Sequence, residues 1–364
     1  MDRLVSKVGK NRNLVLVLAI SLLGFVGLLD IFVVDKVFAP IVYFYIAFGI
    51  VLLLYGVYPL YNNRRLTRYY LDRTKRNRLA IFGLAFILFL ILLAVIGPFF
   101  TLDPTAVSFE EKNLPPLGFT IEQSVYDAEA GKLVTVSVPG TIRHLLGTDN
   151  KGRDMLAMLV SGARVSLQVG LLATLIALIL GTIIGVISAY LGGWADNILM
   201  RFTDIMMTFP FFLLLVFIIF IFGPNLAIIV LVIGLTGWTG AARLIRSEAL
   251  SLRSREFVLA SKGLGASGSR LIFAHLIPNV ISLVIVIATL SIPGVILAEA
   301  ALSFIGLGDP TVPSWGTVLK AGQQTLDTAW WVAVEPGLML FLTVLAFNFL
   351  GDGLRDAFDP KSGL

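Results

Sequence analysis

The chain has 364 residues, of which 57% are hydrophobic and only 14% are charged. Soluble domains carry about a quarter charged residues, so this composition excludes an ordinary soluble protein and predicts an all-α polytopic membrane protein. The net charge of +5 lies in short basic segments beside apolar runs, which indicates cytoplasmic loops and no nucleic-acid partner. There is no cysteine, so disulfides and thiolate ligands are excluded.

Two apolar runs, 14–34 and 41–60, open the chain. Each has about the length of a membrane span, and only a few residues join them, so we expect residues 1–60 to form a transmembrane hairpin. Residues 61–78 carry seven Lys and Arg residues against a single acid, Asp72. This bias predicts a basic linker on the cytoplasmic side of the membrane.

Six further apolar runs predict that residues 79–364 form the main membrane domain. With the first hairpin this gives about eight spans embedded in the lipid bilayer of the cell membrane, with both termini in the cytoplasm. The six runs are 79–100, 163–191, 198–222 with a break at Pro210, 226–244, 280–301 with a kink at Pro293, and 335–350.

Two connections between these runs are predicted to lie outside the cell. The insert 101–162 is rich in acids, and the alternating pattern of 131–140 predicts a short strand within it. In the connection 302–334, three tryptophans suit a membrane interface; they are Trp315, Trp330 and Trp331. The two histidines, His144 and His275, are expected on opposite sides of the membrane, so a histidine metal site is not expected.

The polar stretch 243–279 contains residues that typically start and end short helices, and we expect it to form a helical elbow on the cytoplasmic side. Ser254 is predicted to cap a short helix with Glu256 in its first turn, and Gly265 to end that helix in the left-handed conformation. Ser267 is predicted to cap a second short helix, and Pro278 to close it.

One face of the first short helix carries Phe257, Ala260, Ser261 and Leu264 at helical spacing, so it is narrow and largely apolar. Such a face suits docking in a groove on another protein. A helix that lies on the lipid headgroups is the alternative.

The spans hold few groups that could carry chemistry. The sequence contains no phosphate-binding loop, nucleophile elbow or His-Glu-x-x-His motif, so we expect no enzyme activity in this chain. Asp204 is predicted to pair with Arg201 near the membrane surface. Glu299 and Asn348 lie deeper, where each either lines a solute path or bonds to a neighbouring helix.

Several blocks resemble a known family. FVLASKGLGASGSRLIFAHLIPN is similar to the EAA motif of ABC-importer permeases, a cytoplasmic helix-turn-helix that docks on the ATPase subunit. Ala260, Gly265 and Pro278 match the motif, while Leu259 replaces its glutamate and Ser261 its second alanine. Four further blocks resemble the C-type permease subunits of dipeptide, oligopeptide and nickel importers. They are LGTDNKGRDML, AYLGGWADNILMRFTDIMMTFP, ILAEAALSFIGLGDPTVPSWG and LAFNFLGDGLRDAFDPK.

The resemblance implies a six-helix type I importer core that begins near Leu79, with the hairpin 1–60 outside the family pattern. It implies a homologous second permease subunit, two cytoplasmic ATPase subunits that hold ATP and Mg, and an extracytoplasmic solute-binding protein. This chain itself would need no cofactor. The residues implied in ATPase docking and coupling are Glu256, Phe257, Ala260, Ser261, Gly265, Ala266, Ser267 and Pro278.

Among the solutes of that family, a peptide is predicted in preference to nickel, because no imidazole or thiolate is expected in the spans. The candidate path residues, Trp238, Glu299 and Asn348, suit amides and ammonium groups, and the hydroxyls of Thr236 and Thr239 add to them. Sugars suit the same groups, so an oligosaccharide stays open. An ion-coupled secondary transporter is the alternative from another class, and it would need coupling-ion ligands near the midplane.

Overall fold

The computed structural model describes residues 77–127 and 132–358. The chain divides into two units, Met1–Arg76 and Asn77–Leu364. The hairpin predicted for 1–60 and nearly all of the basic linker therefore lie outside the described residues. The second unit is the helical domain that follows.

Five stretches of this domain are long and apolar enough to cross a membrane, and a bent helix pair could supply a sixth span. The predicted helical membrane fold is confirmed, although the count of eight spans is not tested. The five stretches are Arg78–Phe99, which contains α5 (Arg78–Ile96); α6 (Met155–Leu191); α9 with α10 (Leu226–Thr236 and Trp238–Arg253); Gly268–Phe304, which contains α12 (Gly268–Arg270) and α13 (Ile277–Phe304); and α15 (Trp331–Phe358).

The bent pair consists of α7 (Gly193–Thr208) and α8 (Phe211–Phe222), which meet at an angle of 77°. The break falls at Pro210, whose ring has no backbone N–H to continue α7. The predicted interruption is therefore confirmed. Because α8 exposes large apolar side chains such as Phe217 and Phe220, this pair needs lipid or another protein around it.

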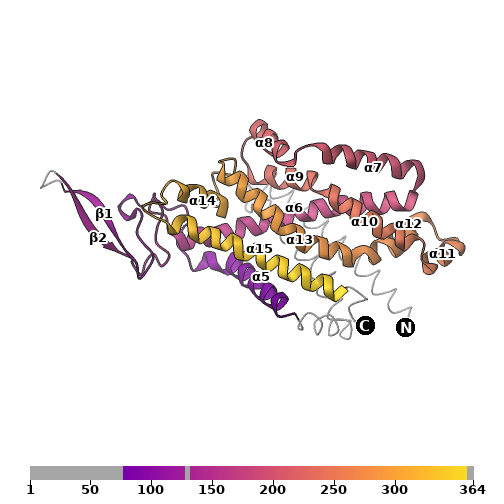
Figure 1. Ribbon diagram of the computed structural model, residues 1–364, viewed down its shortest axis with the longest axis horizontal. Coiled ribbons are helices and arrows are strands. Elements are labelled where there is room, and N and C mark those ends of the chain that lie inside the picture. Colours follow the sequence, from indigo (N-terminus) through magenta and orange to yellow (C-terminus); the bar gives the residue numbers. More distant parts are fainter. Residues whose placement is uncertain (1–76, 128–131, 359–364) are drawn as a thin grey trace, which may run out of the picture. The chain divides into compact units, whose positions relative to one another are not determined.

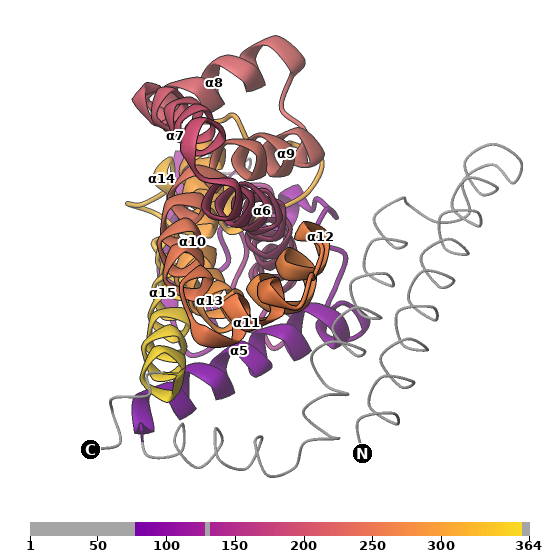
Figure 2. The same cartoon turned by 90° about the vertical axis from the view of Figure 1, so that its right-hand side faces the viewer.

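Helix α6 lies in the middle of the bundle and contacts α5, α9, α10 and α13 (Figure 2). Small residues permit the close approach to α10: a side chain on Gly185 would meet the carbonyl oxygen of Ala242 at 2.6 Å. The helix begins at Met155, eight residues earlier than predicted, because the Asp154 carboxylate accepts a hydrogen bond from the Ala157 amide at 2.8 Å and caps it. The predicted insert 101–162 therefore ends at Asp154.

Two short elements lie at one end of the bundle, which we call the hairpin end (Figure 1). Strands β1 (Thr120–Asp127) and β2 (Lys132–Pro139) form an antiparallel hairpin; β2 was predicted and β1 was not. The second element, helix α14 (Trp315–Gln323), was also not predicted, and Ser314 and Thr317 form a capping box at its start.

Two of the three tryptophans of this region pack inside the protein, and their predicted place at a membrane interface stays a prediction. Trp315 and Trp331 are fully buried, whereas Trp330 is 41% exposed. Each buried indole donates to a backbone carbonyl, Trp315 to Leu159 at 3.1 Å and Trp331 to Thr148 at 3.0 Å. Buried indoles need such acceptors; these two join α14 to the start of α6 and α15 to the loop before it.

Candidate functional site

The opposite end of the bundle, the elbow end, carries the turn between α10 and the next span. Helix α11 (Glu256–Gly263) forms the turn, followed by α12 and a π-helical turn, η4 (Leu271–Leu276), that leads into α13. We call residues 254–276 the elbow. The sequence prediction of 243–279 was too wide on both sides, because α10 continues to Arg253 and α13 begins at Ile277.

The end of α11 is set by Gly265, which has a φ of 81°. The Gly265 amide donates to the Lys262 carbonyl at 3.0 Å and the Ala266 amide to the Ser261 carbonyl at 3.1 Å. These two bonds form a Schellman motif, which satisfies carbonyls that a helix end otherwise leaves open. The predicted left-handed glycine at this position is confirmed, and it turns the chain sharply toward α12.

Two of the predicted helix boundaries in the elbow are wrong. Ser254 does not cap α11; Arg255 is at that position, and the Ser254 hydroxyl donates back to the Ser251 carbonyl at 2.9 Å. Pro278 does not close a helix, because it stands in the first turn of α13, where a missing N–H costs nothing. The prediction for Ser267 is confirmed, since its hydroxyl accepts from the Arg270 amide.

The elbow has one side that packs inward. Val258 is 3% exposed, and the Ser261 hydroxyl lies 3.1 Å from Nε2 of His275. The Phe257 ring packs near the same imidazole, with ring centroids 6.2 Å apart. These contacts fix α11 against η4, so Ser261 is a support for the turn and not part of its outer face.

The other side of the elbow is apolar and exposed. Leu264 is 90% exposed and Leu259 54%, and Ala260 is exposed beside them. Phe257 lies between the two sides: its ring packs near His275 and is still 42% exposed. Sequence reasoning missed Leu259 because it considered that position only as a departure from the motif glutamate. A cluster of large apolar side chains at this exposure is a feature of protein contact surfaces.

Ion pairs join the elbow end to the neighbouring helices. On α10, Arg246 donates to both carboxylate oxygens of Asp196 on α7, and the Ser188 hydroxyl on α6 donates to the same carboxylate. Arg243 on α10 forms an ion pair with Asp204 on α7. The predicted partner of Asp204 was Arg201, so this prediction is wrong; the pair links two helices and not two turns of one helix.

A cavity of about 380 Å³ opens among α6, α8, α9, α10 and α13. Its wall is almost entirely apolar, and glycines keep it open, since a side chain built on Gly240 or Gly294 would meet no atom within 4 Å. The polar groups on its wall are Thr174 and Ser291. Thr174 is 3% exposed, and its hydroxyl has no hydrogen-bond partner in the described part of the chain.

None of the three path residues predicted from the sequence lines this cavity. Trp238 is 4% exposed and stacks on Phe202, with ring centroids 5.9 Å apart. Asn348 is half-buried on α15. The Thr236 hydroxyl donates to the Val232 carbonyl of its own helix at 2.6 Å.

Glu299 is the deepest of the predicted path residues, with 1% exposure. Its carboxylate accepts from the Ser303 hydroxyl at 2.6 Å on its own helix and from the Ser166 hydroxyl on α6 at 3.3 Å. The geometry therefore favours the structural alternative for Glu299, a bond between neighbouring helices. No group of three or more His, Cys, Asp and Glu residues in the described ranges is placed to hold a metal ion.

A bundle of apolar spans around an internal cavity, with an exposed apolar elbow at one end, is the architecture of a membrane transport permease. Residues 155–363 match the family described as binding-protein-dependent transport system inner membrane component, and this chain belongs to that family. Residues 66–116 match a second description, the N-terminal transmembrane domain of oligopeptide transport permease C.

Curated relatives extend the likeness over most of the domain. The dipeptide transport system permease protein DppC of Bacillus subtilis is 40% identical over 294 residues, which is 79% of this chain and 84% of that protein. The oligopeptide transport system permease protein OppC of Haemophilus influenzae is 38% identical over 289 residues, 79% of this chain and 86% of that protein. A putative peptide permease of Brucella suis is 44% identical over 225 residues, 61% of this chain and 74% of that protein.

Proposed function

We propose that this protein is the translocation subunit of an ATP-driven importer that moves dipeptides or oligopeptides across the cell membrane into the cytoplasm. The observation that carries this proposal is its 40% identity, over 79% of the chain, to a dipeptide transport permease. The apolar cavity between the spans supplies a place for the solute to pass.

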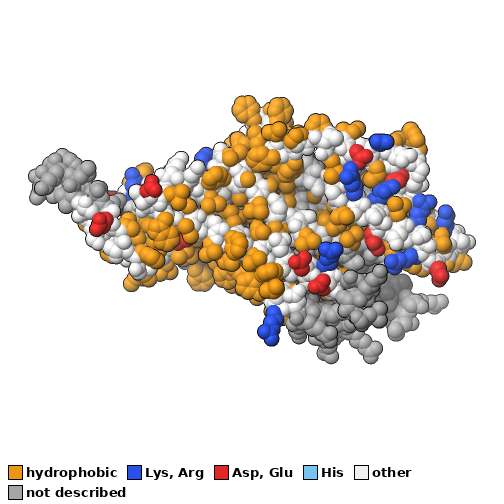
Figure 3. Space-filling model, viewed as in Figure 1, with side chains coloured by type: hydrophobic (Ala, Val, Ile, Leu, Met, Phe, Trp, Pro, Cys, Tyr) orange, Lys and Arg blue, Asp and Glu red, His pale blue; other side chains and the backbone are white. Residues whose placement is uncertain are grey.

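The sides of the membrane follow from charge. The elbow end carries the exposed basic residues Arg255, Lys262 and Arg270, and Figure 3 shows most Lys and Arg side chains of that face near this end. Basic loops stay in the cytoplasm. The elbow, the start of α5 and the end of α15 are then cytoplasmic, and the β1–β2 hairpin and α14 lie outside the cell.

The elbow is the proposed contact with the ATPase subunits, which would hold ATP and Mg and perform the hydrolysis. Phe257, Leu259 and Leu264 offer apolar side chains to a groove, whereas Ser261, Gly265 and Ser267 shape the turn that presents them. Movement of the elbow would reach the spans through α10, whose Arg246 is bonded to Asp196 on α7.

The cavity among α6, α8, α9, α10 and α13 is the proposed part of the solute path in this subunit. A wall of glycine and apolar side chains with two hydroxyls makes few specific bonds, and a route for peptides of varied sequence has no need of more. A homologous second permease would cover the face of α8, and a solute-binding protein outside would select the solute.

The test is ATPase stimulation of the complete transporter reconstituted with its solute-binding protein. Short peptides are expected to stimulate hydrolysis, and oligosaccharides and nickel salts to leave it at its basal rate. Stimulation by an oligosaccharide or by nickel alone would contradict the peptide assignment. Uptake driven by an ion gradient without ATP would contradict the importer class and support a secondary transporter.

A further inference from the structure

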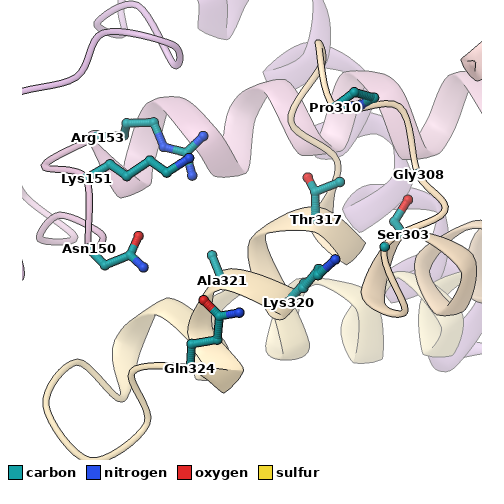
Figure 4. A pocket seen from close by; sticks show the side chains of 11 residues that line it. Asn150, Lys151, Arg153, Ser303, Gly308, Pro310, Thr317, Lys320, Ala321 and Gln324 are labelled. Carbon is teal, nitrogen blue, oxygen red and sulfur yellow. The ribbon is translucent and has the colours of Figure 1, made fainter. Parts of the chain in front are cut away.

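A second cavity, of about 290 Å³, lies at the hairpin end of the molecule. Three segments form its wall: the loop before α6, the turn after α13 and one face of α14. Figure 4 shows Lys151 and Arg153 extending from the first segment and Lys320 from α14 around the same space. The lining includes no acidic side chain.

The charges of this cavity are only partly compensated. Arg153 is paired with the fully buried Asp149 at 2.6 Å, and that carboxylate also accepts from the amides of Lys151 and Arg153. Within residues 77–127 and 132–358, neither Lys151 nor Lys320 forms an ion pair. One acid neutralises one of the three cations, so the cavity keeps an excess of positive charge.

Another acid beside the lining, Asp309, is bonded to other groups. Asp309 lies between two residues of the lining, but its carboxylate accepts from the Leu226 amide at the start of α9 and from the amide and hydroxyl of Thr311. These bonds hold the carboxylate on its own loop and on the start of α9.

The side chain of Lys320 reaches the backbone of the turn after α13. Gly306 has a φ of 94°, and a Cβ built on it would lie 2.2 Å from Lys320 Nζ. The ammonium group therefore rests against bare backbone that no other residue could provide. Asn150 adds a buried amide oxygen that has no hydrogen-bond partner in the described part of the chain, and with it an amide group whose nitrogen can donate.

We propose that this cavity binds a carboxylate of the transported solute, most simply the C-terminal carboxylate of a peptide, before the solute enters the spans. The inference rests on the proposed function, under which solute arrives at the hairpin end. Two lysines and an arginine around one space are the donors that a carboxylate requires. The volume suits one or two residues of a chain and not a whole oligopeptide, so the cavity holds an end of the solute.

Ser303 connects this cavity to the end of α13. Ser303, which lines it, donates to Glu299 at 2.6 Å, and Glu299 also accepts from Ser166 on α6. A ligand in this cavity would therefore contact the end of α13. The same helix also lines the cavity among α6, α8, α9, α10 and α13. An acidic side chain on the solute-binding protein is the other source of a carboxylate, and the experiment separates the two.

The experiment uses the complete transporter in proteoliposomes with saturating solute-binding protein. Uptake of a tetrapeptide with a free C-terminus is compared with uptake of the same peptide as its C-terminal amide. Lys320→Met and Lys151→Met are expected to lower kcat/KM roughly tenfold for the free acid and to leave the amide nearly unchanged. Lys112→Met is the matched control, because Lys112 lies over the Phe109 ring at the same end of the domain and does not line the cavity.

The outcomes are distinct. An equal loss for both peptides, or a weaker apparent affinity for the solute-binding protein, would overturn the inference in favour of a docking role. Unchanged uptake of the free acid in both variants would also overturn it. If the parental transporter takes up neither peptide, the proposed function itself fails. The effect of Lys320→Met is further expected to shrink as ionic strength rises.

Discussion

Arg246 of α10 donates hydrogen bonds to both carboxylate oxygens of Asp196 on α7, with 2.6 Å between Nε and Oδ1. The side chains are 29% and 14% exposed, whereas those of the neighbouring pair, Arg243 and Asp204, are both 47% exposed. The first pair is thus partly shielded from solvent, whereas about half of each side chain in the second pair is exposed to it. The structure offers two ion pairs between the same two helices in different surroundings.

Asp196→Asn is expected to lower the free energy of unfolding by about 2 kcal/mol, because it leaves the Arg246 guanidinium partly buried without its charge partner. Asp204→Asn is expected to cost less than about 1 kcal/mol, since exposed pairs contribute little. Thermal unfolding of the purified complex in detergent measures both. Equal shifts in Tm would contradict the difference in burial.

Gly265→Val is expected to strain the elbow by roughly 1 to 2 kcal/mol, because a β-branched residue does not readily adopt a φ of 81°. No atom lies within 4 Å of a Cβ at this position, so the cost is conformational and not steric. Gly263→Ala is the control, since Gly263 also has open space around it and an ordinary φ. The measurement is transport by assembled complexes, and parental transport rates in Gly265→Val would show that the elbow does not couple the subunits.

Leu264→Asp is expected to reduce copurification of the ATPase subunits without lowering the Tm of the permease, because a side chain that is 90% exposed contributes little to the fold. Val136→Asp on β2 serves as the control; Val136 is 44% exposed at the other end of the domain. If both substitutions leave ATPase binding intact, the apolar face of the elbow is not the contact surface.

Thr174→Val is expected to raise stability by about 1 kcal/mol, because it removes a buried hydroxyl without a partner from an apolar wall. It is also expected to change peptide uptake, since Thr174 is one of the residues that line the proposed path. Ser166→Ala is the contrast: it deletes a donor to Glu299 and is expected to destabilise the domain. Lower stability in Thr174→Val would indicate a hydroxyl bond that the present geometry does not contain.

The stability of the loop before α14 is expected to depend on pH through Asp309. Partial burial raises the pKa of this carboxyl, but the bonds from Thr311 and the Leu226 amide outweigh it and hold the pKa below the ordinary 3.8. A lowered folded-state pKa stabilises the fold above the unfolded value, and the contribution is lost as pH falls through the folded value. The difference in Tm between the parental protein and Asp309→Asn should therefore be constant above about pH 4 and shrink below it.

Hydropathy was enough to find the five apolar stretches of the described residues, although not their ends, because a lipid environment imposes length and composition on any helix that crosses it. The left-handed conformation of Gly265 at the end of α11 could also be predicted from the sequence, since a positive φ favours glycine. The burial of Trp315 and Trp331 was not predicted, because an amphipathic indole suits a membrane interface and a buried carbonyl equally well. Only their acceptors, Leu159 and Thr148, show that both indoles pack inside the protein.

The candidate sites depended on contacts between distant segments, which periodicity does not reveal. Asp204 was paired with Arg201 by sequence distance, but α7 and α10 lie against each other and Arg243 reaches it instead. The cavity among α6, α8, α9, α10 and α13 was missed because its wall consists of glycine and apolar residues, and only Thr174 and Ser291 of its lining have a polar side chain. The sequence analysis chose polar residues of the spans as candidates for the solute path. One of them, Glu299 on α13, instead accepts a hydrogen bond from Ser166 on α6.

The span Gly268–Phe304 contains 37 residues and reaches from the elbow to the turn that walls the lysine-lined cavity. At a rise of about 1.5 Å per residue this is a rod of about 55 Å. Pivoted at its middle, a rod of that length converts a tilt of about 6° into opposite displacements of about 3 Å at its two ends. A displacement of the elbow at one end of this span would therefore move the turn that lines the cavity, at its other end, in the opposite direction.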